Sequence, residues 1–138
     1  MNVYLDTSVV VRRLQQENAP LKTWGEWEQA YSSVLLRVEV LRAIDRNRLR
    51  GALTDNEVAQ LVTKANAIFD VVRFVDLTGS IVQRATQSFL TPLGTLDALH
   101  LATALRLAEV GGIDFVFLTH DAELAVAARS VNFSVEGS

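Results

Sequence analysis

The 138-residue sequence contains no cysteine and only two histidines. Without cysteine the chain can form no disulfide, thiolate nucleophile, iron–sulfur cluster or cysteine zinc site. Two histidines alone also disfavour a histidine-rich zinc site. Long apolar runs are missing, because charged residues interrupt every apolar stretch, so no transmembrane helix is predicted. The first residues lack a basic segment and place Asp6 inside their apolar stretch, so we expect no signal peptide and a cytoplasmic protein.

A net charge of −3 leaves the chain slightly acidic, which taken alone disfavours a nucleic-acid partner. The hydrophobic fraction of 49% is normal for a globular chain. The length suits one domain, which we expect to span residues 1–138. If the four acidic residues discussed below are set aside, 13 basic residues face 12 acidic ones, a net charge of +1. The acidity therefore could come from a single site.

Short apolar segments alternate with segments of helical periodicity. The expected strands are residues 2–5, 31–35, 71–75, 115–118 and 133–135. Strands separated by helices imply a parallel sheet that is covered on both faces. We therefore predict an α/β protein with a three-layer α/β/α fold and a central, mainly parallel sheet of about five strands.

Residues that favour helix starts stand before most of the helical segments. Thr54 and Glu57 form a capping box, and Thr95 and Asp121 are expected to cap two later helices. Thr7 and Ser8 can cap the first helix, which is expected to end near residue 16, and residues 36–49 form a further helix.

An aromatic stripe predicts one more helix after Pro20. Trp24, Trp27 and Tyr31 follow one another at spacings of three and four residues, although Gly25 weakens this prediction. These aromatic side chains could stack on bases, but their helical spacing favours a place in the core or at a partner interface.

Four acidic residues fall where a parallel sheet gathers its loops. Asp6 and Asp121 follow the ends of expected strands, whereas Glu39 and Asp97 lie in the first turns of expected helices. Ligands bind such sheets outside the carboxyl ends of the strands, so we expect all four at one rim. Helix capping alone could account for Asp6 or Asp121, and the helix dipole alone could account for Asp97.

The surroundings of Asp97 and Glu39 favour a shared cation over these simpler explanations. The helix around Asp97 is apolar nearly all round, and Glu39 lies on an inward stripe where Arg42 is the nearest basic residue. Unpaired buried carboxylates are costly, and clustered carboxylates raise one another's pKa. Oxygen ligands without cysteine indicate Mg²⁺ or Mn²⁺. Such a cation can activate water and polarise a phosphoryl group, which indicates phosphate chemistry.

Four segments in fixed order carry a family resemblance: V-Y-L-D-T-S at residues 3–8, residues 33–43, L-D-A-L-H-L-A-T-A at residues 96–104, and F-L-T-H-D at residues 117–121. In these segments the sequence resembles PIN-domain proteins, and specifically the VapC toxins of VapBC toxin–antitoxin systems. The resemblance implies a five-stranded parallel sheet and an endoribonuclease that depends on Mg²⁺ or Mn²⁺. It further implies an RNA substrate, inhibition by a cognate VapB-type antitoxin, and a homodimer.

The same resemblance assigns residues to the active site. The acidic cluster of metal ligands and catalytic residues falls on Asp6, Glu39, Asp97 and Asp121. The first and third of these would be the central ligands, while Asp114 or Glu123 could take the place of the fourth, because this acid varies in the family. The hydroxyl groups that support the site would be those of Thr7, Ser8 and Thr119.

His100 and a group of arginines complete the candidate residues. His100 follows Asp97 by one helical turn, and a structural or supporting role is favoured over that of a catalytic base. Arginines concentrate in the first half of the chain, where they form either a solvated helix face or a surface that tracks phosphates. The arginines proposed to bind RNA are Arg12, Arg13, Arg42 and Arg46.

Other functions on a similar sheet fit less well. A receiver-type signalling domain needs a lysine after a late strand, but the only lysines are Lys22 and Lys64. A HAD-type phosphatase needs a second acid two residues after the first, where this chain has Ser8. The remaining alternative is a catalytically weak PIN-like module that acts by binding RNA or protein.

Overall fold

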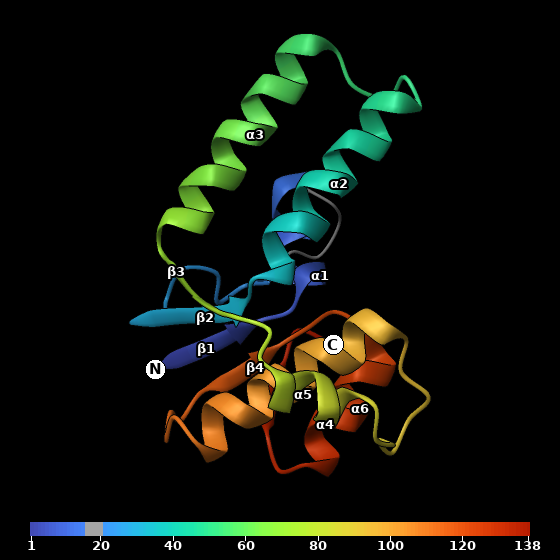
Figure 1. Ribbon diagram of the computed structural model, residues 1–138. Coiled ribbons are helices and arrows are strands. Elements are labelled where there is room, and N and C mark those ends of the chain that lie inside the picture. The colour runs from blue at the N-terminus through green and yellow to red at the C-terminus, as the bar shows by residue number, and fades with distance from the viewer. Residues whose placement is uncertain (16–20) are drawn as a thin grey trace.

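The computed structural model describes residues 1–15 and 21–138 (Figure 1). Five strands form one sheet: β1 (Asn2–Leu5), β2 (Gln29–Ser33), β3 (Val72–Val75), β4 (Val116–Leu118) and β5 (Ser134–Glu136). Six helices lie in the described residues: α1 (Thr7–Gln15), α2 (Leu35–Leu49), α3 (Asp55–Asp70), α4 (Gly79–Ala85), α5 (Thr95–Glu109) and α6 (Ala122–Ser130). None of these helices is both long and apolar enough to cross a membrane.

All pairs of neighbouring strands in the sheet are parallel, in the order β3-β2-β1-β4-β5. The chain starts at the centre of the sheet, builds outward to β3, and then returns to place β4 on the other side of β1. The strand order therefore reverses between β1 and β4, and such a switch point is where open α/β sheets bind ligands. We call the edge at which the strands end the carboxyl edge.

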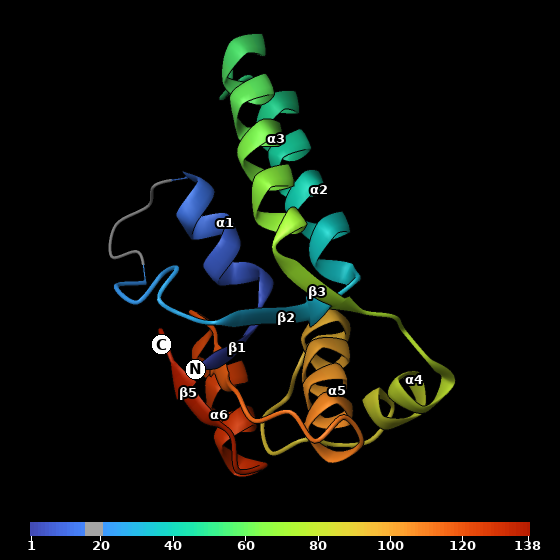
Figure 2. The same ribbon diagram turned by 90° about the vertical axis from the view of Figure 1, so that its left-hand side faces the viewer.

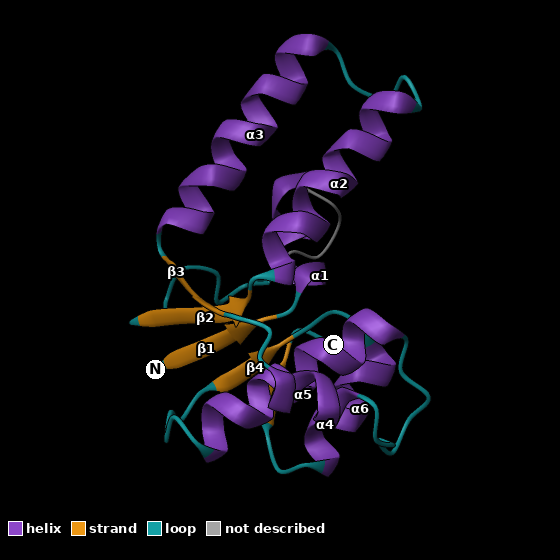
Figure 3. Cartoon of the chain, viewed as in Figure 1, coloured by secondary structure: helices purple, strands orange, loops and turns teal. Residues whose placement is uncertain are grey.

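Helices cover both faces of the sheet, which confirms the predicted three-layer α/β/α fold (Figures 2 and 3). Alternate residues of β1 explain the two layers, because successive side chains of a strand point to opposite faces. Val3 and Leu5 belong to the core formed with α1, α2 and α3. Tyr4 belongs to the second core, which α5 and α6 complete.

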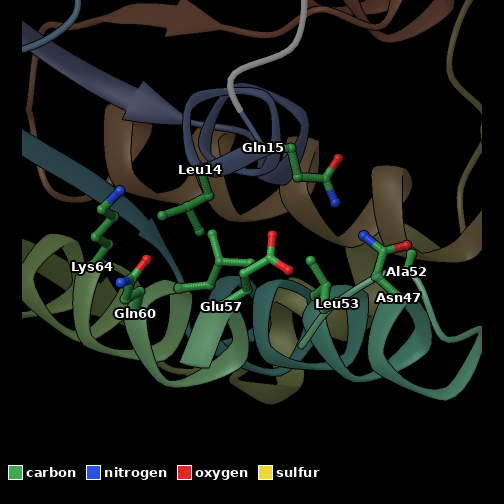
Figure 4. Close-up of a pocket in the computed structure, with 9 residues that line it drawn as sticks. Leu14, Gln15, Asn47, Ala52, Leu53, Glu57, Gln60 and Lys64 are labelled. Atoms are coloured by element: carbon green, nitrogen blue, oxygen red, sulfur yellow. The ribbon is translucent and has the colours of Figure 1, made fainter. Parts of the chain in front are cut away.

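The hairpin of α2 and α3 projects well beyond the sheet (Figure 1). The predicted capping box is confirmed at the start of α3, where Thr54 Oγ1 accepts from Glu57 N and Glu57 Oε1 accepts from Thr54 N. A pocket of about 540 Å³ lies between the hairpin and the end of α1 (Figure 4). Its lining mixes apolar residues such as Leu14 and Leu61 with polar ones such as Lys64.

The predicted helix over Trp24, Trp27 and Tyr31 is wrong. Residues 22–28 form turns and irregular structure, and Tyr31 lies inside β2, paired with Tyr4 of β1. Gly25 adopts φ +82°, a left-handed conformation that ends any right-handed helix. The two tryptophans still meet, with their rings edge to face at 5.1 Å. Pro20, the expected start of this helix, lies outside the described residues.

Two further cap predictions differ in outcome. Asp121 caps α6 as predicted, since its Oδ1 accepts from Leu124 N at 2.9 Å. Thr95 does not cap α5. Gly94 occupies the N-cap position instead and makes no side-chain bond, while Thr95 is the first helical residue.

Candidate active site

Asp6 lies at the switch point of the sheet, directly after β1, and is 3% exposed. Its backbone N–H continues the ladder to β4 by donating to Leu118 O at 3.0 Å. Its side-chain Oδ2 accepts from Ser8 Oγ at 2.6 Å and from Thr119 Oγ1 at 2.9 Å. Charge-assisted bonds of this kind are short and strong, and they fix the orientation of the carboxylate.

The same two hydroxyl groups tie the loop after β4 to Asp6. Ser8 Oγ accepts from His120 N at 2.9 Å, and Thr119 Oγ1 accepts from Asp121 N at 3.0 Å. Each hydroxyl thus donates to the carboxylate and accepts from the backbone. The prediction that Ser8 caps α1 is therefore wrong. Ser8 lies within the first turn of this helix, and its hydroxyl connects loops at the carboxyl edge.

Glu39 is paired with His100, a partner that the sequence reasoning missed. Glu39 Oε1 lies 2.7 Å from His100 Nε2, and the histidine is fully buried in α5. His100 also contacts the hydroxyl groups of Tyr4 (2.9 Å) and Thr7 (3.2 Å). The Thr7 hydroxyl therefore contacts His100, and Thr7 is the first residue of α1. The prediction that Thr7 caps this helix is also wrong. The absence of a basic partner was one argument for a cation at Glu39, and that argument is wrong.

Burial and the negative charges of the other three acids raise the pKa of Asp97. Its pKa is raised to about 6, first by burial and then by the negative charges of Asp6, Asp121 and Glu39, while His100 opposes the shift. Among the described residues, no donor forms a hydrogen bond with its carboxylate. The other three predicted acids are therefore close enough for their charges to act on Asp97.

The charges around His100 act in the opposite direction. Burial alone lowers the pKa of His100, but the hydrogen bond to Glu39 and the negative charges of Asp6, Glu39 and Asp97 outweigh it. The net direction is a raised pKa, which favours a positive charge between α2 and α5. A positive charge on His100 would partly offset the negative charge of the acidic cluster.

The donor set fits a hard divalent cation, although the ligands do not form a closed shell. In the described part of the chain, no three acidic or histidine side chains converge closely enough to hold an ion. The candidate donors are all carboxylate oxygens, and the repulsion that raises the pKa of Asp97 is what a cation would relieve.

The two proposed substitutes for Asp121 are both exposed. Asp114 is exposed and precedes β4, so it lies at the opposite edge of the sheet. Glu123 is exposed on α6, and its backbone carbonyl accepts a bond from Thr91. The repulsion on Asp97 arises from Asp121 instead.

The four arginines predicted to bind RNA lie on two helices, α1 and α2. Arg42 and Arg46 are exposed on α2, about one and two turns beyond Glu39 and therefore on the same face. Arg13 is exposed and lies over the ring of Trp24 at 5.6 Å. Arg12 lies partly exposed on α1.

A parallel sheet in this order, with clustered acids at its switch point, defines an α/β protein of the PIN type. A model of the PIN domain matches residues 3–130, and the chain belongs to the PIN-domain family. It is 30% identical over 138 residues to Ribonuclease VapC47 of Mycobacterium tuberculosis (strain CDC 1551 / Oshkosh), covering 95% of this chain and 93% of the relative. It is 32% identical over 142 residues to Ribonuclease VapC46 of strain ATCC 25618 / H37Rv, covering 96% and 95%. These relatives confirm the resemblance to VapC-type PIN proteins.

Proposed function

We propose that the protein is a metal-dependent endoribonuclease, the toxin of a type II toxin–antitoxin pair, and that it acts on cytoplasmic RNA. It would hydrolyse phosphodiester bonds at a site formed by Asp6, Glu39, Asp97 and Asp121. The presence of three further acids close enough to Asp97 to raise its pKa carries this proposal. The names of the two VapC relatives, both ribonucleases, support the reaction class.

Each residue has a distinct task in this proposal. Asp6 and Asp97 would be the central ligands of Mg²⁺ or Mn²⁺, with Glu39 and Asp121 completing the cluster. The bound cation would activate the attacking water and offset the charge of the phosphodiester. Asp6 is oriented for this purpose by the hydroxyl groups of Ser8 and Thr119, which donate to its Oδ2.

RNA cleavage and metal binding test this proposal together. The purified protein should cleave RNA only with Mg²⁺ or Mn²⁺, and Mn²⁺ should raise its melting temperature. Asp6→Ala should abolish both effects, whereas Asp114→Ala, at the opposite edge of the sheet, should change neither. Sequencing the RNA ends formed after induced expression, beside the Asp6→Ala control, would identify the substrate. RNA binding without cleavage would favour the alternative of a PIN-like binding module.

We also propose a VapB-type antitoxin as the inhibitory partner. The pocket between α1 and the projecting α2–α3 hairpin supports this, because its mixed lining suits an amphipathic segment (Figure 4). Leu61→Asp should weaken the complex with the antitoxin while RNA cleavage by the free toxin continues. Unchanged affinity would move the antitoxin to another surface.

A homodimer is the last element of the proposal. Three apolar side chains, those of Val82, Leu90 and Leu96, are exposed over α4, α5 and the loop between them. An apolar surface of this kind supports association with a second copy. Light scattering should give a mass of two chains, and Leu90→Glu should reduce it to one.

A further inference from the structure

Three buried or partly buried side chains form a hydrogen-bonded line from the central strand to α2. The line begins at Tyr4 of β1, whose hydroxyl lies 2.9 Å from Nδ1 of His100. It continues through Nε2 of His100 to Oε1 of Glu39, at 2.7 Å. The tyrosine and histidine are fully buried, and 19% of the Glu39 side chain is exposed.

The chemistry of these groups determines where the histidine carries its proton. An ionised carboxylate can only accept, so Nε2 must donate to Glu39. When the imidazole is neutral, the Tyr4 hydroxyl donates to Nδ1 and leaves the proton on Nε2. When the imidazole is charged, both nitrogens donate and the Tyr4 oxygen accepts. The bond from Nε2 to Glu39 therefore persists in either protonation state of His100.

The Tyr4 end of the line is packed between aromatic rings. The ring of Tyr4 stacks on Phe117 of β4, with 5.2 Å between centroids and an interplanar angle of 7°. The same ring meets His100 edge to face at 6.0 Å. Glu39, in contrast, belongs to the hairpin that projects beyond the sheet (Figure 2). The line therefore joins a carboxylate on a projecting helix to the central strand of the sheet.

We infer that His100 is a positioning residue, which holds one oxygen of Glu39 and leaves the other for the reaction centre, and that Tyr4 in turn fixes His100. This inference rests on the proposed function, in which Glu39 belongs to the catalytic cluster. Side chains that orient a metal-binding group from behind typically change its affinity for metal about 10- to 100-fold when they are replaced. A merely structural histidine would affect stability alone.

Two substitutions of His100 separate these roles. In His100→Gln the amide nitrogen takes roughly the place of Nε2 and still donates to Glu39, whereas in His100→Asn the shorter amide reaches only the Tyr4 side. We expect Mn²⁺ affinity, measured by calorimetry, to fall about tenfold in His100→Asn and to stay within about threefold of wild type in His100→Gln. Equal Mn²⁺ affinity in wild type and His100→Asn would overturn the inference.

The tyrosine offers a matched pair. Tyr4→Phe removes the hydroxyl that bonds Nδ1, and Tyr31→Phe removes the hydroxyl of its register partner in β2. Tyr4→Phe should weaken Mn²⁺ binding several-fold, while Tyr31→Phe should leave it unchanged. Equal losses in the two variants would show that the effect reflects core packing and would overturn the role of Tyr4.

A nuclear magnetic resonance measurement tests the line even if a His100 variant fails to fold. The Nε2 proton of His100 should resonate far downfield in the metal-free protein and move upfield in Glu39→Gln. A proton that is absent or unmoved would overturn the inference. If the wild type binds Mn²⁺ and cleaves RNA while His100→Asn behaves like it, only the positioning role fails. If the wild type does neither, the proposed function fails and the positioning role fails with it.

Discussion

The hydroxyl of Thr119 donates a 2.9 Å hydrogen bond to Oδ2 of Asp6, across the junction of β4 and β1. The two residues are 113 positions apart and meet because the strands that precede them pair in parallel, with Leu5 opposite Leu118. The same oxygen of Thr119 accepts from Asp121 N. One hydroxyl thus links two of the four acids, and the strand register is what brings these acids to one place.

Replacing Thr119 by valine should therefore destabilise the protein. The substitution removes a donor from Asp6 and leaves the N–H of Asp121 without its acceptor. Leaving buried groups unpaired costs about 1–3 kcal/mol. Urea unfolding would measure the loss. The matched control is Thr103→Val, which also removes a fully buried hydroxyl but one that bonds a carbonyl of its own helix, at Leu99. Equal losses in both variants would contradict a special role for Thr119.

Asp97→Asn should stabilise the metal-free protein at neutral pH. Because the pKa of Asp97 is raised from 3.8 to about 6, the native state holds more protons than the unfolded state between those values. Stability therefore falls as pH rises through this window and stays reduced above it. The variant lacks this penalty. It should exceed the wild type by on the order of 1 kcal/mol at pH 7.5, after allowance for solvent screening, and match it near pH 4.

The control for this prediction is Asp114→Asn, which removes an exposed carboxylate at the other edge of the sheet. Thermal unfolding of the three proteins across pH 4–8, in the presence of a chelator, would separate the two sites. Mn²⁺ added at pH 7.5 should stabilise the wild type more than Asp97→Asn. Parallel pH profiles for wild type and Asp97→Asn would contradict the repulsion that we assign to this site.

Local signals predicted much of the fold. The capping box of Thr54 and the N-cap of Asp121 each act within three residues, so both could be read from adjacent letters. Apolar runs that end at an acid, as at Asp6, marked the carboxyl edge. Local periodicity failed at Tyr31, because aromatic residues three and four apart fit a short helix as well as a turn followed by a strand.

Contacts between distant elements account for what the sequence did not show. Glu39 and His100 are 61 residues apart, and they meet only where α2 and α5 approach each other at the carboxyl edge. No spacing rule connects the two residues. The general expectation that a buried carboxylate needs a partner was sound, and the structure gives Glu39 a buried histidine as that partner.

Replacing Arg42 and Arg46 together by alanine should weaken RNA binding and reduce its dependence on salt. Both side chains are exposed beyond Glu39 on one face of α2. Each phosphate contact that is lost should reduce the slope of log K against log salt by about 0.7 for a single strand, so the pair should reduce it by about 1.4. Fluorescence anisotropy with a labelled RNA, at several salt concentrations, would measure the slope.

The control for the arginine pair is Arg106→Ala with Arg129→Ala. These residues are also exposed, but they lie in the last turns of α5 and α6 and not on α2. The control removes the same charge, so a general electrostatic effect would reduce the slope equally in both double variants. That result would remove the phosphate-binding role from α2.

Gly137→Ala should destabilise the carboxyl edge by more than backbone strain alone. Gly137 has φ +100°, and a Cβ added there would lie 2.8 Å from the carbonyl oxygen of Thr119. Gly25→Ala is the matched control, because its φ of +82° is similarly strained while its Cβ would meet nothing within 4 Å. Both variants should lose about 1–2 kcal/mol to left-handed strain. Gly137→Ala should lose on the order of 1 kcal/mol more, because the chain must move away from a backbone atom. Equal losses in urea unfolding would show that this approach to Thr119 adds nothing to stability.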